Sequence, residues 1–285
     1  MKKFFVLRPA ILVSLFLLAR FTSVAQFSPD SPVGVSAGFL KLFGTINAFT
    51  AHADVQALDT NRVETLRGPM NFAMLAGKLR MDFDIAQMQG SGVNPLLIRA
   101  LKQAGLDKIA SILRLDKRTI HLVFSGSRSY VNMEMSPSDL EAAQKNVQVQ
   151  RTPLGKETID NHACTKNRVI VKNAKGVALF EGITWNASDL KDFPVKISSQ
   201  TKEGTMVMHF TQIQMTPPAA AQFEVPAGYT RYASTEALFL TIAQKQNAPP
   251  KAAASKPVSP QKPVSSSART ATPKPKSASG SATKK

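Results

Sequence analysis

The chain has 285 residues, 43% of them hydrophobic, and its 36 Lys and Arg against 19 Asp and Glu give a net charge of +17. Cys164 is the only cysteine, which excludes a scaffold held together by internal disulfides. The charge is uneven, because residues 26–245 carry 24 basic and 19 acidic residues whereas residues 246–285 carry eight basic residues and no acidic one. The basic character therefore belongs mainly to a tail.

Residues 1–25 have the organisation of a cleavable export signal. Basic residues up to Arg8 precede an apolar run over 10–19, and small residues end at Ala25. The run is too short for a membrane span, which takes about 20 apolar residues. We therefore expect a periplasmic or secreted protein whose mature chain starts with a lead segment over residues 26–39.

Most of the following sequence predicts strands. Apolar and polar residues alternate over 81–85, 119–124 and 205–210, which is typical of strands with one buried face. Turn-forming sequences separate such stretches, for example at 76–78 and 173–176. The economical interpretation is a meander of antiparallel hairpins.

A few helices interrupt the strands. Asn94 is a good N-cap, and the sequence from there to Gly105 has apolar residues at helical spacing. A second helix is expected over 106–113, which would form a helical hairpin with the first one. Shorter helices are expected over 136–145 and 234–244.

The predicted fold class is α+β, with one domain over residues 40–245 that antiparallel strands dominate. Residues 246–285 are rich in Lys, Pro, Ala and Ser and have almost no large apolar side chain. Such a segment cannot bury enough surface to offset the entropy of ordering, so a disordered basic tail is expected.

Several short motifs carry a family resemblance. They are Arg114-Leu115-Asp116-Lys117, Ser129-Tyr130, the glycine-to-cysteine stretch 155–166, the stretch 185–196 with Trp185 and Phe193-Pro194-Val195-Lys196, and Phe223-Glu224-Val225-Pro226-Ala227-Gly228-Tyr229. Together they resemble exported bacterial domains of unknown function with the outer-membrane lipoprotein carrier (lipoprotein-sorting) fold. The resemblance spans roughly residues 40–232. Asn161 departs from the usual glycine, but asparagine tolerates the positive φ of a turn.

The resemblance implies a half-barrel, that is, a curved antiparallel sheet wrapped around a few helices, with an apolar cavity that can take acyl chains. Methionine and phenylalanine side chains in the strands are the candidates to line it: Phe72, Met74, Met81, Phe83, Met133, Met206, Met208 and Phe210. Methionine is flexible enough to accept variable chains. The alternative is a filled core that contains the same residues. No residue matches the carrier's lipoprotein-handling positions.

Catalytic and metal chemistry are not indicated. Ser91 and Ser127 have glycine neighbours, but both lie where turns are expected, and neither sits in a nucleophile motif. His52, His121, His162 and His209 lack metal-ligand spacing. We therefore expect no catalytic residue, no cofactor and no metal. Cys164 is expected to be buried, the alternative being an intermolecular disulfide.

The tail offers a candidate surface for polyanions. Its lysines are Lys251, Lys256, Lys262, Lys274, Lys276, Lys284 and Lys285. For an exported chain the partners would be anionic lipid headgroups or envelope polymers, bound in a salt-dependent way, whereas the simpler alternative is a solubilising tail. Sequence-specific nucleic-acid binding is not expected.

Two functions follow. The first is a non-enzymatic exported binding protein that holds an acyl lipid or lipoprotein-type ligand in the half-barrel, with the tail on an anionic envelope surface. The second is a structural or interaction protein of the envelope with a solid core and no small ligand. An enzyme is a distant third.

Overall fold

The structure is a computed structural model of the chain and describes residues 37–143, 147–200 and 204–247. The chain divides into two units, residues 1–247 and 248–285, and every described residue belongs to the first. The predicted export signal and basic tail lie outside the described residues.

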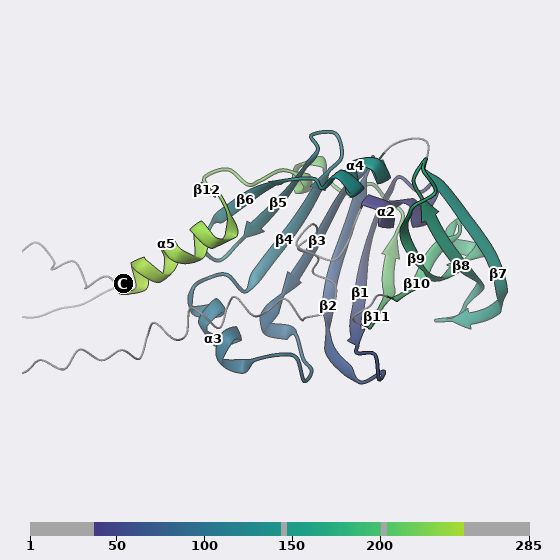
Figure 1. Cartoon of the computed structure of the whole chain (residues 1–285), viewed down its shortest axis with the longest axis horizontal. Helices are drawn as coiled ribbons and strands as arrows, with labels where there is room; N and C mark the ends of the chain where they lie inside the picture. The colour runs from purple at the N-terminus through teal and green to yellow at the C-terminus, as the bar shows by residue number, and fades with distance from the viewer. Residues whose placement is uncertain (1–36, 144–146, 201–203, 248–285) are drawn as a thin grey trace, which may run out of the picture. The chain divides into compact units, whose positions relative to one another are not determined.

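Twelve strands and a few helices make up the described part of this unit (Figure 1). The strands are β1 (Ala48–Leu58), β2 (Glu64–Leu75), β3 (Lys78–Asp84), β4 (Lys108–Arg114), β5 (Thr119–Phe124), β6 (Ser129–Glu134), β7 (Gln148–Ile159), β8 (His162–Lys172), β9 (Ala178–Ala187), β10 (Phe193–Gln200), β11 (Thr205–Gln214) and β12 (Thr230–Tyr232). The α-helices are α2 (Ala37–Leu40), α3 (Pro95–Gln103), α4 (Pro137–Ala143) and α5 (Thr235–Asn247). Single 3-10 turns are η2 (Lys41–Phe43), η3 (Ile85–Gln87), η4 (Ser188–Leu190) and η5 (Ala220–Phe223).

All twelve strands form one open, curved sheet in the order β12-β6-β5-β4-β3-β2-β1-β11-β10-β9-β8-β7. The predicted meander holds within each half, since β1 to β6 and β7 to β11 each pair in chain order. The halves join where β1 pairs with β11, so the connection after β6 carries the chain to the opposite edge of the sheet. The β12–β6 pair is parallel, and the other strand pairs of the described residues are antiparallel. The α+β prediction with a curved antiparallel sheet is thus confirmed.

One face of the sheet, here called the core face, carries the main hydrophobic core. In β1 every second residue from Phe49 to Ala57 is buried, as the alternation of a one-sided strand requires. The short α2 and η2 pack on this face, where Phe43 contacts Phe49, Phe193 and Phe210. The backbone N–H of Ala37 donates to the buried carboxylate of Asp139 at 2.7 Å, which ties α2 to α4.

The opposite face, here called the groove face, has a smaller core of its own over β2 to β5. Phe223 from η5 is completely buried there against Ala73, Ala110, Ile112 and Val123. Phe223 thus anchors the segment that follows β11 to the sheet. The two faces are therefore covered by different parts of the sequence.

The predicted helix over 106–113 is wrong, because residues 108–113 belong to β4. Both faces of β4 are covered, so its burial is nearly continuous from Ala110 to Arg114. A continuous apolar run in a doubly covered strand can match helical spacing by chance. The helix predicted before it is confirmed as α3. The side chain of Asn94 accepts hydrogen bonds from the backbone N–H groups of Leu96 and Leu97, and the chain turns after the helix at Gly105, which has a φ of 68°.

The other helix predictions agree with the structure. Ser136 accepts a hydrogen bond from the N–H of Asp139 at the start of α4, and Ser234 accepts one from Ala237 at the start of α5. Among the described residues, no helix combines the length and the apolar character needed to cross a membrane.

Candidate functional site

The eight cavity candidates all lie on the core face. The register places Phe72 opposite Met81, and Met70 opposite Phe83, in neighbouring strands. The same alternation puts Met206, Met208 and Phe210 of β11 on this face, because Met208 pairs with Val55. Residues from β2, β3, β6 and β11 thus share one surface, as the sequence alternation predicts.

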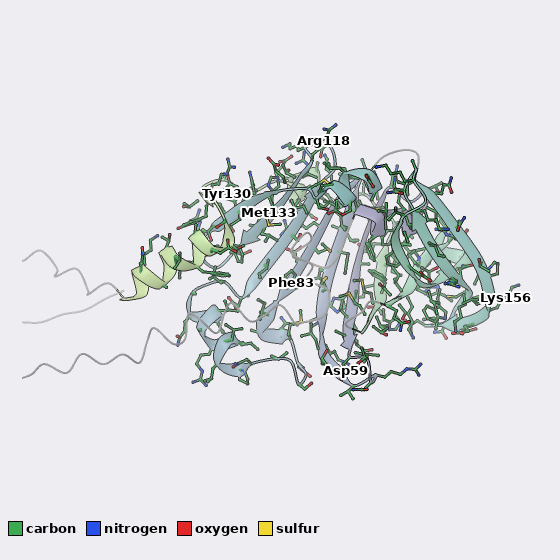
Figure 2. The ribbon with its side chains drawn as sticks, in the orientation of Figure 1. Asp59, Phe83, Arg118, Tyr130, Met133 and Lys156 are labelled. Carbon is green, nitrogen blue, oxygen red and sulfur yellow. The ribbon has the colours of Figure 1, made fainter. Side chains whose placement is uncertain are left out.

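Five of these candidates are core residues in the described structure. Phe72, Met74, Met81, Met208 and Phe210 are each at most 5% exposed. The rings of Phe72 and Phe210 are 5.1 Å apart in an edge-on contact, within the cluster that includes Phe43. The remaining three, Phe83, Met133 and Met206, are half-buried against this core, and Figure 2 labels the first two.

The largest described pocket lies on the groove face, over β7 to β11 and the end of β1. Its volume is about 770 Å³. Its lining residues are Leu58, Arg62, Leu154, Arg168, Glu181, Gly182, Ile183, Ser198, Gln200, Thr205 and Val207. This volume falls within the range of about 300–1,000 Å³ typical of small-molecule sites.

Cross-strand pairing explains why these residues meet. Arg168 of β8 lies opposite Ile183 of β9, which lies opposite Ser198 of β10. Ser198 in turn lies opposite Val207 of β11. The row combines an apolar floor from Ile183 and Val207 with one charged end, where Arg168 pairs with Glu181. The groove can therefore accept an apolar chain beside polar groups.

A second row of side chains borders the groove one pleat further along the same strands. Lys166, Trp185, Lys196 and His209 are direct neighbours on β8, β9, β10 and β11. The ammonium groups of Lys166 and Lys196 lie 5.1 and 5.0 Å from the centroid of the Trp185 ring. Both distances are within the range of cation–π contacts.

The β7–β8 hairpin reaches over this row. Glu157 of β7 accepts hydrogen bonds from the Trp185 indole at 2.6 Å and from Lys166 at 2.7 Å, and these two bonds hold its pKa below the usual value. Asp160 in the hairpin turn lies 2.6 Å from Nε2 of His209 on β11. Because β7 and β11 are separated by three strands, these contacts require the groove face to be concave here.

The motif Arg114-Leu115-Asp116-Lys117 is structural. Arg114, whose side chain is 3% exposed, forms two hydrogen bonds to Asp116 and donates to the carbonyl of Phe223 and the carboxylate of Glu224. The guanidinium lowers the pKa of Asp116 to about 2 and also lowers the pKa of Glu224. Arg80 of β3 holds the neighbouring carbonyl of Gln222. Both arginines therefore fix the segment around Phe223 to the sheet.

The serine and histidine candidates have structural partners. Ser91 donates to the carbonyl of Glu64, and Ser127 pairs with Ser129. His121 pairs with Asn132, and His162 pairs with Asp189, whose pKa the hydrogen bond from His162 lowers. His52 and His209 pair with Asn71 and Asp160. In the described part of the chain, no three His, Cys, Asp or Glu side chains converge as a metal site would need.

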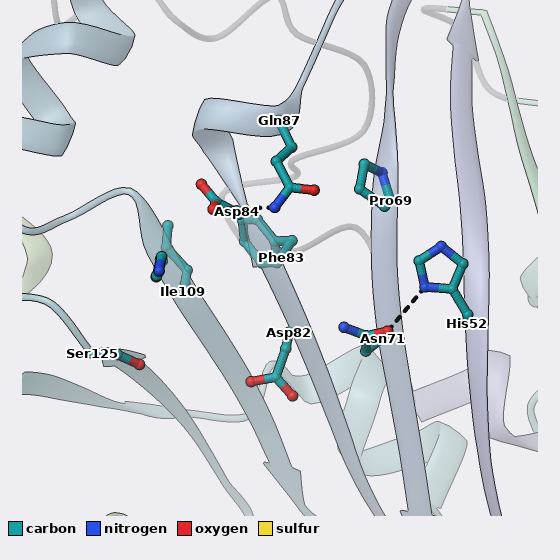
Figure 3. A pocket seen from close by; sticks show the side chains of 10 residues that line it. His52, Pro69, Asn71, Asp82, Phe83, Asp84, Gln87, Ile109 and Ser125 are labelled. Atoms are coloured by element: carbon teal, nitrogen blue, oxygen red, sulfur yellow. Dashed lines mark hydrogen bonds between the residues drawn. The ribbon is translucent and has the colours of Figure 1, made fainter.

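A smaller pocket of about 260 Å³ also lies on the groove face, around His52, Asn71 and Asp82 (Figure 3). These three side chains come from the adjacent strands β1, β2 and β3, and Nδ1 of His52 lies 2.9 Å from Oδ1 of Asn71. Phe83 also lines this pocket. Its volume is about a third of that of the groove, which makes it less suited to an acyl chain.

Cys164 is 2% exposed, and burial raises the pKa of its thiol, which confirms the predicted burial. The turn at Asn161 has a φ of 66°, as expected where asparagine replaces glycine. The tail lysines proposed for polyanion binding lie outside the described residues.

Sequence reasoning missed the groove. Most of its residues come from the strand positions that alternate with more deeply buried ones, such as Ser198, which follows the buried Ile197. Such positions are ordinarily solvent-facing. The only local signal was the pair Trp185 and Lys196, both inside the quoted motifs.

Comparisons with known proteins give a partial match. Residues 184–229 match the model of a family described as a domain of unknown function, DUF4412. No curated protein matches the chain in sequence. The matched segment runs from β9 to the turn after Phe223, and so contains Trp185, Lys196 and the groove residues of β10 and β11.

Solved structures with some likeness include lipoprotein LppX of Mycobacterium tuberculosis, at 11% identity and a TM-score of 0.35 over 66% of this chain and 94% of that one. LprF from Mycobacterium bovis has 12% identity and a TM-score of 0.32 over 68% and 95% of the two chains. A LolA superfamily protein from Nitrosomonas europaea has 8% identity and a TM-score of 0.28 over 67% and 98%. TM-scores of this size do not define the fold, which is given by the strand order and register. Over residues 184–229, the predicted resemblance to a family of domains of unknown function is confirmed.

Proposed function

We propose that this chain is a non-enzymatic periplasmic or secreted binding protein that holds an apolar, acyl-type ligand in the groove of its curved sheet. The observation that carries the proposal is the groove itself, about 770 Å³ in volume, with an apolar floor from Leu58, Ile183 and Val207. A site of this size is typical of small-ligand pockets, and the polar and charged groups that make up the rest of its lining, Arg62, Arg168, Glu181, Ser198, Gln200 and Thr205, could contact a polar end of the ligand.

The half-buried candidates on the core face remain a second possible contact surface for the same ligand. Phe83, Met133 and Met206 are the members that an acyl chain could reach without displacing the core. The other five pack tightly, and separating them would open a cavity at a cost of several kcal/mol. The groove is therefore the better supported site.

The experiment is native mass spectrometry, with solvent extraction, on the mature chain purified without detergent from an envelope fraction. Adduct masses that match acyl lipids support the proposal. A mass equal to that of the polypeptide alone, together with no binding of added acyl probes, contradicts it. Binding of a fluorescent fatty acid then locates the site.

Two neighbouring residues supply matched variants for that location. Met206 and Val207 are both half-buried, but they point to opposite faces of β11. Val207→Asp should weaken acyl binding about ten-fold or more if the chain lies in the groove, whereas Met206→Asp should do so if it lies on the core face. Val177→Asp, in an exposed position 57% accessible to solvent, is the control.

The second function is an interaction protein without a small ligand. The phenylalanine cluster that fills the core face favours it, and so does the edge strand β7, of which eleven of the twelve residues are exposed. Pro153 and the bulge beside it interrupt the free edge of β7. Such interruptions limit unspecific pairing of an edge strand with strands of other chains. Absence of any acyl adduct together with a retained protein partner would favour this function.

The cationic tail is proposed to bind anionic envelope polymers or lipid headgroups. Removal of residues 246–285 should abolish binding of the protein to vesicles that contain anionic lipid while acyl binding is retained. Because the attraction is electrostatic, binding of the full chain should also weaken steeply with salt.

A further inference from the structure

Lys196 is the basic side chain in the Lys166–Trp185–Lys196–His209 row that forms no salt bridge among the described residues, although it lies close enough to Glu157 to help lower the pKa of that carboxyl group. Lys166 pairs with Glu157 at 2.7 Å, and His209 pairs with Asp160 at 2.6 Å. The ammonium group of Lys196 instead lies over the face of Trp185, 5.0 Å from the ring centroid. The charge of Lys196 is therefore the one in this row that a ligand could neutralise.

The surroundings of Lys196 make its charge energetically unfavourable in the absence of a bound anion. Its side chain is half-buried between Trp185, itself 7% exposed, and the neighbouring strand position of His209. Such burial removes part of the water that solvates an ammonium group. The aromatic face and the nearby carboxylate of Glu157, which is already paired with Lys166, compensate for only part of the loss. A bound anion would offset the remainder.

Lys196 also lies at the border of the groove. It is two residues before Ser198 on β10, on the same face of the strand and about 7 Å away. Ser198 lines the groove between Ile183 and Val207. An apolar chain on that floor would thus bring one of its ends next to the ammonium group.

We propose that the groove selects acyl ligands with an anionic head group, and that Lys196 forms the ion pair with this group. The inference rests on the proposed function, since it names the head group of the ligand that the groove holds. A carboxylate and a phosphate monoester share the required chemistry, and an uncharged alcohol lacks it.

The test compares three probes with the same 16-carbon chain: hexadecanoate, hexadecyl phosphate and hexadecanol. Their affinities for the mature chain are measured at pH 8, where both acids are ionised. The proteins are wild type, Lys196→Met, Lys196→Arg and the control Lys156→Met. Methionine keeps an apolar stem against Trp185, and Lys156 is an exposed lysine of β7 at the outer edge of the sheet (Figure 2).

The expected result is that wild type and Lys156→Met bind at least one anionic probe about ten-fold more tightly than hexadecanol. Lys196→Met should lose this preference while its affinity for hexadecanol stays the same, and Lys196→Arg should keep the preference. The stronger of the two anionic probes identifies the head group. Because the tail is present in all four proteins, its lysines cannot produce the difference.

Two results overturn the inference and separate it from the proposed function. If wild type binds all three probes equally, or if Lys196→Met keeps its preference, the groove holds acyl chains but Lys196 selects no head group. If no probe binds to wild type, the proposed function fails and the inference fails with it. Thermal unfolding of each variant verifies that it is folded.

Discussion

Arg114 is the residue on which the docking of the segment around Phe223 depends most directly. Its buried guanidinium donates hydrogen bonds to two carboxylates and one backbone carbonyl. The neighbouring Lys117, in contrast, forms a single exposed ion pair with Glu224 at 3.2 Å. Arg114→Met should lower the free energy of unfolding by about 2–3 kcal/mol, the scale of hydrogen bonds to charged groups. Lys117→Met should cost less than about 1 kcal/mol, as exposed ion pairs do. Urea unfolding measures both, and equal losses would contradict the role given to Arg114.

The same ion pair predicts an acid-sensitive contribution to stability. The folded-state pKa of Asp116 is lowered to about 2, below its value of about 3.9 in an unfolded chain. A carboxyl group with a lowered pKa stabilises the fold above the unfolded pKa, and this contribution is lost as the pH falls from about 4 toward 2. Urea midpoints measured from pH 5 to pH 2.5 should therefore fall less steeply in Asp116→Asn than in wild type. Parallel curves would show that Asp116 gains nothing from Arg114 in the folded state.

At the scale of elements, the junction between α3 and β4 depends on two glycines in contact. A Cβ atom on Gly105 would lie 2.7 Å from the carbonyl carbon of Gly126, whereas one on Gly176 would meet nothing within 4 Å. Both Gly105 and Gly176 have positive φ angles, 68° and 80°. Gly176→Ala should thus cost only the conformational strain, about 1–2 kcal/mol. Gly105→Ala should lower the free energy of unfolding clearly more than Gly176→Ala does, since it adds a clash with the backbone of Gly126. Similar thermal shifts in the two variants would mean that the junction can move apart.

The success of element prediction depended on how many faces of an element are covered. β3 and β11 each have one more deeply buried face, so their alternation over 81–85 and 205–210 was visible in the sequence. β4 is covered on one face by the main core and on the other by Phe223. Its apolar residues are therefore consecutive rather than alternating, and some of them matched the spacing of a helix. The covering residue lies more than 100 positions later in the chain, and local periodicity carries no information about it.

For the whole molecule, the sequence was sufficient to predict the curved antiparallel sheet but not the pairing of its two halves. The groove exists because β1 pairs with β11, which brings Leu58 next to Thr205. It also needs the β7–β8 hairpin to curl over the groove face, through Glu157 and Asp160. Both features arise from long-range register and from the twist of the sheet, so the groove could not be predicted from the sequence, and the residues named in advance as cavity candidates lie on the core face instead.

That curl can be tested with Trp185, the only tryptophan of the chain. The indole is 7% exposed and donates to Glu157, so its fluorescence should be poorly quenched by acrylamide. Replacing both Glu157 and Asp160 by alanine removes the side-chain contacts of the hairpin with Trp185 and His209, and should raise the quenching constant at least two-fold with an unchanged circular-dichroism spectrum. The control is Glu181→Ala. Glu181 lies on β9, the strand of Trp185, and its replacement breaks only the exposed pair with Arg168 of β8. If quenching is unchanged in the double variant, the backbone ladder from β7 to β9 holds the concave surface by itself, because the ladder is what remains intact.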